Sequence, residues 1–273
     1  MIIPCFNDGR FLKGVLASLD GAEPLEVLVV DDHSTDPDTR RELEALEANG
    51  TRVIHHDRNR GVAAARTTGL RASRARYVFP LDADDLAEPP SLSAMADMLD
   101  AHPEAGVCFG DYREFGDSEL VRAVPLWLDP YRIAYTNEYP VSSMFRRSRL
   151  EEVGGWPVRD RQPMFEDWDL WMDLASRGER GIHLGVGPVV YHRRLHGLRL
   201  LQRGKQRYGQ LYRQMRADHP ELFGRLREHR RASDLSRPRK LLYPVVYGRR
   251  PRLRIEPRIK ALLDRAGVWT LRR

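Results

Sequence analysis

Long apolar runs, paired cysteines and a leader-like start are all missing from this chain. No hydrophobic stretch approaches the roughly 20 residues that a helix needs to cross a bilayer, and the mean hydropathy is −0.55. The first residues lack a basic segment followed by an apolar stretch, so we expect no secretion signal. The only cysteines, Cys5 and Cys108, lack the spacing of metal ligands. We therefore expect reduced thiols in a cytoplasmic protein.

Several common nucleotide-binding and catalytic motifs are also absent. The chain contains no G-x-G-x-x-G, no G-x-x-x-x-G-K-[ST], no G-x-S-x-G and no H-E-x-x-H. These absences argue against a dinucleotide-binding domain, a P-loop NTPase, an α/β-hydrolase and a zinc protease. We also find no internal repeat.

The charge of the chain is unevenly distributed. Its 273 residues suffice for one α/β domain with a full core and a small appendage. Residues 222–273 hold 16 Lys or Arg and 4 Asp or Glu, whereas the rest of the chain holds 29 and 35. The body is therefore mildly acidic and the tail strongly basic. This asymmetry predicts an anionic partner for the tail, either a membrane surface or a nucleic acid.

Strand-like and helix-like segments alternate along the N-terminal half. The expected strands are 2–3, 25–30, 51–55, 77–81 and 106–109, and the expected helices are 8–19, 39–48, 62–74 and 92–101. This alternation is typical of an α/β fold with a mainly parallel central sheet flanked by helices. The second half is less regular, with strands expected at 141–146 and 186–191 and helices at 149–153, 168–176 and 200–218. In such sheets, ligands bind beyond the carboxyl ends of the strands.

An apolar run at 77–81 leads directly into a cluster of carboxylates. If the segment stays extended, Asp82 and Asp84 point the same way, because side chains alternate along a strand. Neighbouring carboxylates suit Mg²⁺ or Mn²⁺. Such an ion can bridge the diphosphate of a sugar nucleotide and stabilise it as it leaves. The alternative is an acidic loop that caps a helix beginning near Pro89.

Two further polar segments follow expected strands. Asp31 and Asp32 end an apolar strand and could accept hydrogen bonds from a base and from ribose hydroxyls. The alternative is a turn that caps the next helix. Gly61 opens a small-residue helix, whose start attracts phosphate, and Arg66 on that helix could reach the nucleotide. Close packing of the helix on the sheet explains the small residues equally well.

The second half carries two candidate segments. Glu166 and Asp167 stand beside Trp168, and an apolar wall raises the proton affinity of a carboxylate, as a general base requires. A helix cap and a core tryptophan are the alternatives. Farther along, His196 could ligate a metal, and the arginines before it could bind diphosphate. A structural or solvated histidine is the alternative.

In order along the chain, these segments resemble the motifs of the inverting glycosyltransferases of family 2, which have the GT-A fold. The matching segments are P-C-F-N at 4–7, V-D-D-H-S-T-D at 30–36, N-R-G-V-A-A-A-R at 59–66, L-D-A-D-D at 81–85, G-G-W at 154–156 and E-D at 166–167. The match runs from residue 2 to about residue 199. The first four motifs are specific only when taken together.

The resemblance implies a role for each matched residue. The nucleotide would be held by Pro4, Phe6, Asn7, Asp31, Asp32 and Arg66. Ribose, diphosphate and a Mn²⁺ or Mg²⁺ ion would be addressed by Asp82 and Asp84, with Asp84 as the direct metal ligand. Asp167 would be the base, with Glu166 in reserve, and the acceptor side would be shaped by Trp156 and Trp168.

The late part of the chain departs from the family pattern. Thr67 follows Arg66 where the family often has asparagine, and Arg199 stands three residues after His196 where it often has serine. The second departure leaves open whether His196 is a metal ligand and whether Arg193 and Arg194 bind diphosphate.

We therefore expect a hexosyltransferase of polysaccharide biosynthesis that works by single displacement. Asp167 would deprotonate a glycan, lipid-linked or small-molecule hydroxyl, which attacks a nucleotide-diphosphate sugar of the UDP or dTDP type. A sugar-nucleotide nucleotidyltransferase is an alternative, although residues 7–13 lack its Gly-rich basic loop. A non-catalytic relative that binds anionic surfaces through its tail is another.

We expect two parts in the chain. A GT-A-like catalytic domain covers 1–199, with a nucleotide-sugar half over about 1–110 and an acceptor half over about 111–199, and an Arg-rich helical extension covers 200–273. Apolar and basic residues alternate at helical spacing over 255–266, which suits a helix lying on the inner face of the cell membrane, or one packed on the catalytic domain. The tail has few aromatics among its arginines, so we expect no nucleic acid partner.

Overall fold

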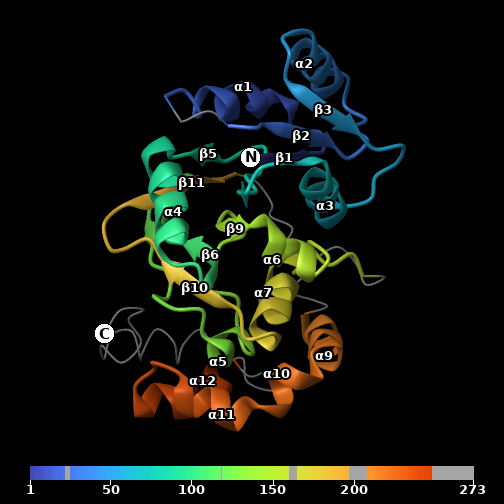
Figure 1. The fold of residues 1–273 in the computed structure, drawn as a ribbon. Coiled ribbons are helices and arrows are strands. Elements are labelled where there is room, and N and C mark those ends of the chain that lie inside the picture. The colour runs from blue at the N-terminus through green and yellow to red at the C-terminus, as the bar shows by residue number, and fades with distance from the viewer. Residues whose placement is uncertain (22–24, 118, 160–164, 197–207, 248–273) are drawn as a thin grey trace.

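The structure of the chain is a computed structural model that describes residues 1–21, 25–117, 119–159, 165–196 and 208–247 (Figure 1). Its first layer is a fully parallel sheet in the order β1-β2-β3, formed by β1 (Ile2–Cys5), β2 (Leu28–Asp31) and β3 (Arg52–His55). Helices α1 (Gly9–Ala17) and α2 (Pro37–Ala48) lie on one side of this sheet, and α3 (Val62–Ala72) lies on the other (Figure 1). The carboxyl ends of β1 and β2 therefore meet at one edge.

Two mixed sheets form the middle of the molecule. One has the order β10-β6-β9-β4 and contains β4 (Tyr77–Val78), β6 (Ala105–Phe109), β9 (Met144–Arg146) and β10 (Arg180–His183). The other has the order β5-β11-β7-β8 and contains β5 (Leu86–Ala87), β7 (Asp111–Gly116), β8 (Val121–Arg122) and β11 (Val189–Leu195). A parallel bridge pairs Ile2 with Pro80, which brings the chain after β4 alongside β1.

The remaining helices cover these sheets and continue below them. The middle of the molecule holds α4 (Pro89–Ala101), α5 (Pro130–Ile133), α6 (Arg147–Glu152) and α7 (Glu166–Ser176). A further helical layer, at the bottom of Figure 1, consists of α9 (Tyr208–Asp218), α10 (Pro220–Gly224), α11 (Leu226–Ala232) and α12 (Arg237–Val246). No helix in the described ranges is long and apolar enough to span a membrane.

The core is strongly aromatic, and it contains both cysteines. Trp156, Trp168 and Trp171 are among the largest fully buried side chains. Cys5 and Cys108 are buried free thiols. Burial raises the pKa of each thiol to about 12, so both are protonated at neutral pH. The expectation of reduced thiols therefore agrees with their surroundings.

The predicted α/β class is confirmed, with one difference in strand direction. Only the first sheet is wholly parallel, because β9, β5 and β8 each run antiparallel to a neighbour. Of the strand expected at 77–81, only residues 77–78 form a strand, which is β4. The helix expected at 255–266 lies outside the described residues.

Candidate active site

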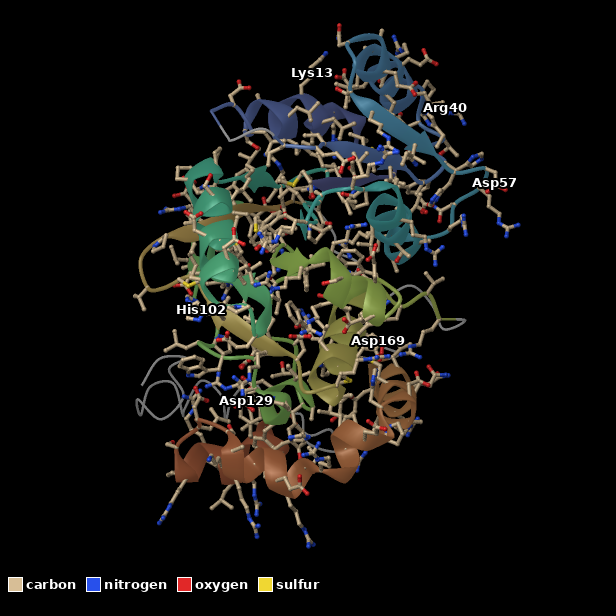
Figure 2. The ribbon with its side chains drawn as sticks, viewed as in Figure 1. Lys13, Arg40, Asp57, His102, Asp129 and Asp169 are labelled. Atoms are coloured by element: carbon tan, nitrogen blue, oxygen red, sulfur yellow. The ribbon has the colours of Figure 1, made fainter. Side chains whose placement is uncertain are left out.

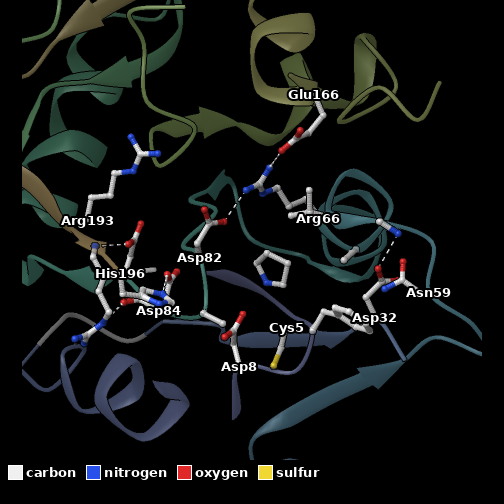
Figure 3. Close-up of a pocket in the computed structure, with 18 residues that line it drawn as sticks. Cys5, Asp8, Asp32, Asn59, Arg66, Asp82, Asp84, Glu166, Arg193 and His196 are labelled. Atoms are coloured by element: carbon white, nitrogen blue, oxygen red, sulfur yellow. Dashed lines mark hydrogen bonds and ion pairs between the residues drawn. The ribbon is translucent and has the colours of Figure 1, made fainter. Parts of the chain in front are cut away.

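A cavity of about 620 Å³ opens where the end of β1, the start of α3, the start of α7 and the end of β11 converge (Figure 3). Ten of the candidate nucleotide, metal and catalytic side chains line it, together with Gly61: Pro4, Phe6, Asp32, Arg66, Asp82, Asp84, Glu166, Arg193, Arg194 and His196. Its wall holds six carboxylates and three arginines. Segments far apart in the sequence are thus brought to one strongly charged site.

Asp32 fixes the loop that leads into α3. Its carboxylate oxygens accept hydrogen bonds from the backbone N–H groups of Arg60, at 2.8 Å, and Gly61, at 2.7 Å. His56 Nδ1 lies 2.7 Å from the same carboxylate. Gly61 adopts a φ of 86°, a left-handed conformation that favours glycine. These bonds hold the positively polarised start of α3 against the cavity, as phosphate binding requires.

Asp31 and Asn7 shape the neighbouring loop and are not among the residues that line the cavity. Asn7 Oδ1 accepts hydrogen bonds from the backbone of Thr35 and Asp36, at 2.7 and 2.9 Å. Asp31 accepts from the Ser34 N–H and lies 2.9 Å from His55 Nδ1. Burial alone would raise the pKa of Asp31, but these hydrogen bonds outweigh it and lower the pKa. Both side chains therefore order the loop beside the site.

Arg66 bridges two distant acidic segments. Its guanidinium donates to Asp82 Oδ1 at 2.6 Å and to Glu166 Oε1 at 2.9 Å, while only 2% of the residue is exposed. Burial would lower the pKa of Arg66, but the two carboxylates raise it, so the guanidinium stays charged. The bridge joins the acidic segment at 82–85 to the start of α7 (Figure 3).

The acidic motif is a turn, which corrects one premise of the sequence analysis. The Asp85 N–H bonds to the Asp82 carbonyl at 3.0 Å, so strand alternation does not set the directions of Asp82 and Asp84. Both side chains reach the cavity but meet different partners. Asp82 pairs with Arg66, whereas Asp84 Oδ2 lies 2.8 Å from His196 Nε2.

The donor set around Asp84 fits a divalent cation. A carboxylate and an imidazole stand together there, and Asp8 and Asp82 line the same cavity. Burial and then the charge of Asp84 raise the pKa of Asp8, which indicates crowded negative charge. No three His, Cys, Asp or Glu side chains in the described part of the chain converge on one point. Mg²⁺ and Mn²⁺ accept such sparse protein ligation because diphosphate oxygens and water complete their shell.

The two arginines of β11 differ in their surroundings. Arg194 Nε donates to the Asp84 carbonyl at 2.9 Å, and its guanidinium lies over the rings of Phe11 and Phe115. It therefore supports the acidic turn. Arg193 also lines the cavity (Figure 3). Burial would lower the pKa of Arg193, but neighbouring groups, Tyr191 first, raise it.

Asp167 stands beside the cavity at the start of α7. Its Oδ1 accepts from the Trp168 N–H and its Oδ2 from Asn137 Nδ2, both at 2.8 Å. Burial, and then the adjacent charge of Glu166, raise the pKa of Asp167 to about 6. The preceding Phe165 adopts a left-handed φ of 66°, a sparsely populated conformation for a bulky residue. With a pKa of about 6, the Asp167 carboxylate has the proton affinity that a general base needs at neutral pH.

The tryptophans proposed for the acceptor side are core residues. Trp156 is 1% exposed and Trp168 is 2% exposed. The ring of Trp156 packs edge-on against Phe145, and the Trp168 indole donates to the Ile133 carbonyl at 2.6 Å. Neither ring stands free to stack on a sugar in this structure, because Trp156 packs on Phe145 and Trp168 on Tyr212. The core alternative for Trp168 is therefore the one observed.

Two residues of the site were missed in the sequence analysis. Asp8 lines the cavity, and Asn137 contacts the candidate base. Asp8 follows the first motif directly, so its position was the available signal. Asn137 lies in an irregular loop 30 positions before Asp167, and no spacing indicates that contact.

Comparison with known proteins gives a consistent picture. The family model described as Glycosyl transferase family 2 matches residues 1–154. The Escherichia coli protein named chondroitin synthase is 35% identical over 204 residues, which is 71% of this chain and 28% of that protein. The matches span only 22% to 62% of the length of the curated relatives.

Solved structures share the fold at lower identity. S. aureus TarS, residues 1–349, has a TM-score of 0.62 and 19% identity, covering 96% of this chain and 77% of its own. The same TarS fragment has been crystallised with UDP and with UDP-GlcNAc. The mannosyltransferase PcManGT from Pyrobaculum calidifontis, in complex with GDP-Man and Mn²⁺, has a TM-score of 0.55 and 22% identity, covering 98% of this chain and 79% of its own.

Proposed function

The chain belongs to glycosyl transferase family 2, and from this membership we propose that it transfers a hexose from a nucleotide-diphosphate sugar to an acceptor hydroxyl with inversion. The observation that carries the proposal is the Asp167 carboxyl. Its pKa of about 6 suits a base, and it stands next to Glu166, which lines the charged cavity. Asp167 would take the proton of the attacking hydroxyl in a single displacement.

The donor is proposed to bind between β1 and the start of α3. Pro4 and Phe6 supply an apolar wall, and the start of α3 presents backbone N–H groups to the diphosphate. Arg193 contributes a positive charge as the nucleotide leaves. We favour a UDP or dTDP sugar; TarS has been crystallised with UDP-GlcNAc, and PcManGT with GDP-Man.

The metal site is proposed at Asp84, with Asp82 and His196 as further candidate ligands. A bound Mn²⁺ or Mg²⁺ would neutralise charge that builds up on the diphosphate. The PcManGT complex holds Mn²⁺, which supports a divalent ion but leaves the choice between the two metals open for this chain. Arg66 would position Asp82 through the bond described above.

We propose a growing glycan, free or lipid-linked, as acceptor, and an anionic membrane as partner of residues 222–273. The outer face of α12 exposes Leu241 and Val245, which are 66% and 52% accessible. The same layer exposes the arginines Arg225, Arg227, Arg230, Arg231 and Arg237. Apolar side chains framed by positive charge suit the surface of an anionic bilayer. The protein would then work in the cytoplasm, attached to the inner face of the membrane, and without a nucleic acid partner.

The first test separates binding from turnover. Asp167→Asn should lower kcat by roughly 10²–10⁴-fold, because the base is lost. Thermal shift with UDP, GDP, dTDP and CDP, each with and without Mn²⁺, should show an unchanged response of the variant to one nucleotide. A ligand at about 100 times its Kd adds about 2.7 kcal/mol, which is readily measured.

Two results would contradict the proposal. Normal turnover by Asp167→Asn would exclude Asp167 as the base. Absence of any nucleotide shift in the unmutated protein would favour a non-catalytic relative.

A further inference from the structure

We propose that Asn137 is a positioning residue that orients the Asp167 carboxylate and favours its ionised form, an inference that rests on the proposed function. Asn137 Nδ2 donates to Asp167 Oδ2 at 2.8 Å, and the Trp168 N–H donates to Asp167 Oδ1 at the same distance. Each carboxylate oxygen thus has a donor. The plane of the carboxylate is therefore fixed relative to the start of α7.

The orientation of the Asn137 amide is itself determined. Its Oδ1 accepts a hydrogen bond from the Tyr139 N–H at 3.2 Å, so its Nδ2 is turned toward Asp167. Tyr139 is 2% exposed, and its hydroxyl donates to the Trp127 carbonyl at 2.5 Å. The amide is consequently anchored on a rigid part of the core.

The C-terminal helical layer holds the Asn137 loop. On one side of the loop, the Tyr131 hydroxyl donates to the Lys240 carbonyl of α12 at 2.6 Å. Beside it, the buried Arg132 reaches Glu138 at 3.1 Å and Asp234 at 3.4 Å. Residues 131–138 are therefore bound to α12 and to the segment just before it.

The same layer also holds the segment that carries the base. Trp168 stacks on Tyr212 of α9 with ring centroids 5.6 Å apart. The Tyr212 hydroxyl donates to the Ala134 carbonyl at 2.6 Å. The segments that carry Asp167 and Asn137 both contact the C-terminal helical layer. The distance between the two side chains is therefore set by the fold.

Charged groups around Asp167 shift its pKa in opposite directions, and Asn137 acts in the same direction as the nearby arginines. Glu166 raises the pKa of Asp167, whereas Arg66 and Arg193 lower it. A hydrogen bond donated to the ionised carboxylate also lowers the pKa. Loss of the amide donor should therefore raise the pKa of the base.

The test compares Asn137→Ala, which deletes the donor, with Asn137→Asp, which keeps the shape and removes the donor. We expect kcat to fall about 10- to 100-fold in both, because the base is misplaced or protonated, while the KM for donor sugar changes little. The acidic limb of kcat/KM should move up by roughly one pH unit in Asn137→Ala and farther in Asn137→Asp. Asn49→Asp, at the exposed end of α2, is the matched control and should change neither value.

An acidic limb at the wild-type pH in Asn137→Asp, together with wild-type kcat, would overturn the inference. Turnover by Asp167→Asn separates this failure from that of the proposed function. If Asp167→Asn is inactive and the Asn137 variants are normal, only the positioning role is lost. Unchanged nucleotide-induced thermal shifts in both Asn137 variants verify that each variant is folded.

Discussion

The surroundings of Asp167 raise its pKa above the usual value of an aspartate, through burial first and then the charge of Glu166. The carboxyl is held at the start of a helix between a buried tryptophan and a second carboxylate, and its pKa rises to about 6. Glu166, one position earlier, forms an ion pair with Arg66 instead. The two neighbours therefore have different partners: Glu166 is held by the arginine bridge, whereas Asp167 accepts hydrogen bonds from Asn137 and from the Trp168 backbone.

The raised pKa predicts a pH dependence with a definite sign. Below about pH 6 the Asp167 carboxyl becomes protonated and cannot accept a proton, so kcat/KM should fall about tenfold per pH unit. Above that pH it should reach a plateau. Initial rates from about pH 4.5 to about pH 8, at constant ionic strength, would measure this limb. A rate that stays flat to pH 4.5 would show that a different group is the base.

The sequence predicted which carboxylates share a pocket better than it predicted the contacts that individual side chains make. The carboxylates that follow apolar strands were expected to share one pocket, and Asp32, Asp82 and Asp84 do line one cavity, because the chain after β4 runs parallel to β1 at Pro80. The contact of Asn137 with Asp167 was not predictable, because a loop contact depends on tertiary packing. The burial of Trp156 was missed for a related reason, since an aromatic side chain suits both a sugar-binding surface and a core.

At the scale of elements, α3 owes its place to a close approach to β1. A Cβ added at Gly69 would collide with the side chain of Ile2, so only glycine lets the helix lie at its present distance. The same approach sets the start of α3 against the cavity. Ala63, Ala64 and Ala65 of the same helix are also buried, so these small residues take part in packing, and this packing positions the helix end at the cavity.

This contact predicts opposite effects for two glycine substitutions. Gly69→Ala should lower the free energy of unfolding by about 1–3 kcal/mol, because the methyl group overpacks the interface. Gly14→Ala, in the exposed part of α1, meets nothing within 4 Å and should raise it by about 0.5–1 kcal/mol. Urea unfolding midpoints would measure both. Equal midpoints for the two variants would contradict this account of α3.

Helices were predicted better than short strands. The expected and observed helices in the first half overlap closely, because their apolar residues recur at helical spacing. Strands β5 and β8, of two residues each, were not predicted, because pairing with distant strands creates them. The antiparallel pairs of β5 with β11 and of β9 with β4 and β6 also join strands that are distant in sequence. The alternation of strands and helices therefore predicted more parallel pairing than the structure has.

At the scale of the whole molecule, the C-terminal helices pack against the middle of the molecule and also expose a basic surface. Their inner side contacts α5 and α7, while long side chains tipped with nitrogen extend from α11 and α12 away from the rest of the molecule (Figure 2). His219 links the layer to α7 through Asp169, with Nε2 and Oδ1 2.6 Å apart. A surface on this layer would thus be rigidly coupled to the site.

Vesicle flotation of the full chain tests the membrane proposal. The protein should float with vesicles containing phosphatidylserine, much less with pure phosphatidylcholine, and less again at high salt. Replacing both Leu241 and Val245 by Glu should reduce binding about tenfold or more, because exposed apolar contacts are lost. Val186→Glu is the matched control, since Val186 is 70% exposed and lies in the connection between β10 and β11. Equal flotation of all three proteins would exclude the α12 face.

The two buried cysteines can report on local opening of the structure, because each becomes reactive only when solvent reaches it. Cys5 lies on the wall of the cavity and Cys108 within β6, and both thiols are almost wholly protonated while folded. An alkylating reagent attacks the thiolate, so labelling has to wait for a fluctuation that admits solvent. Because the two thiols lie in different strands, their separate labelling rates would distinguish a breathing pocket from the opening of the whole chain.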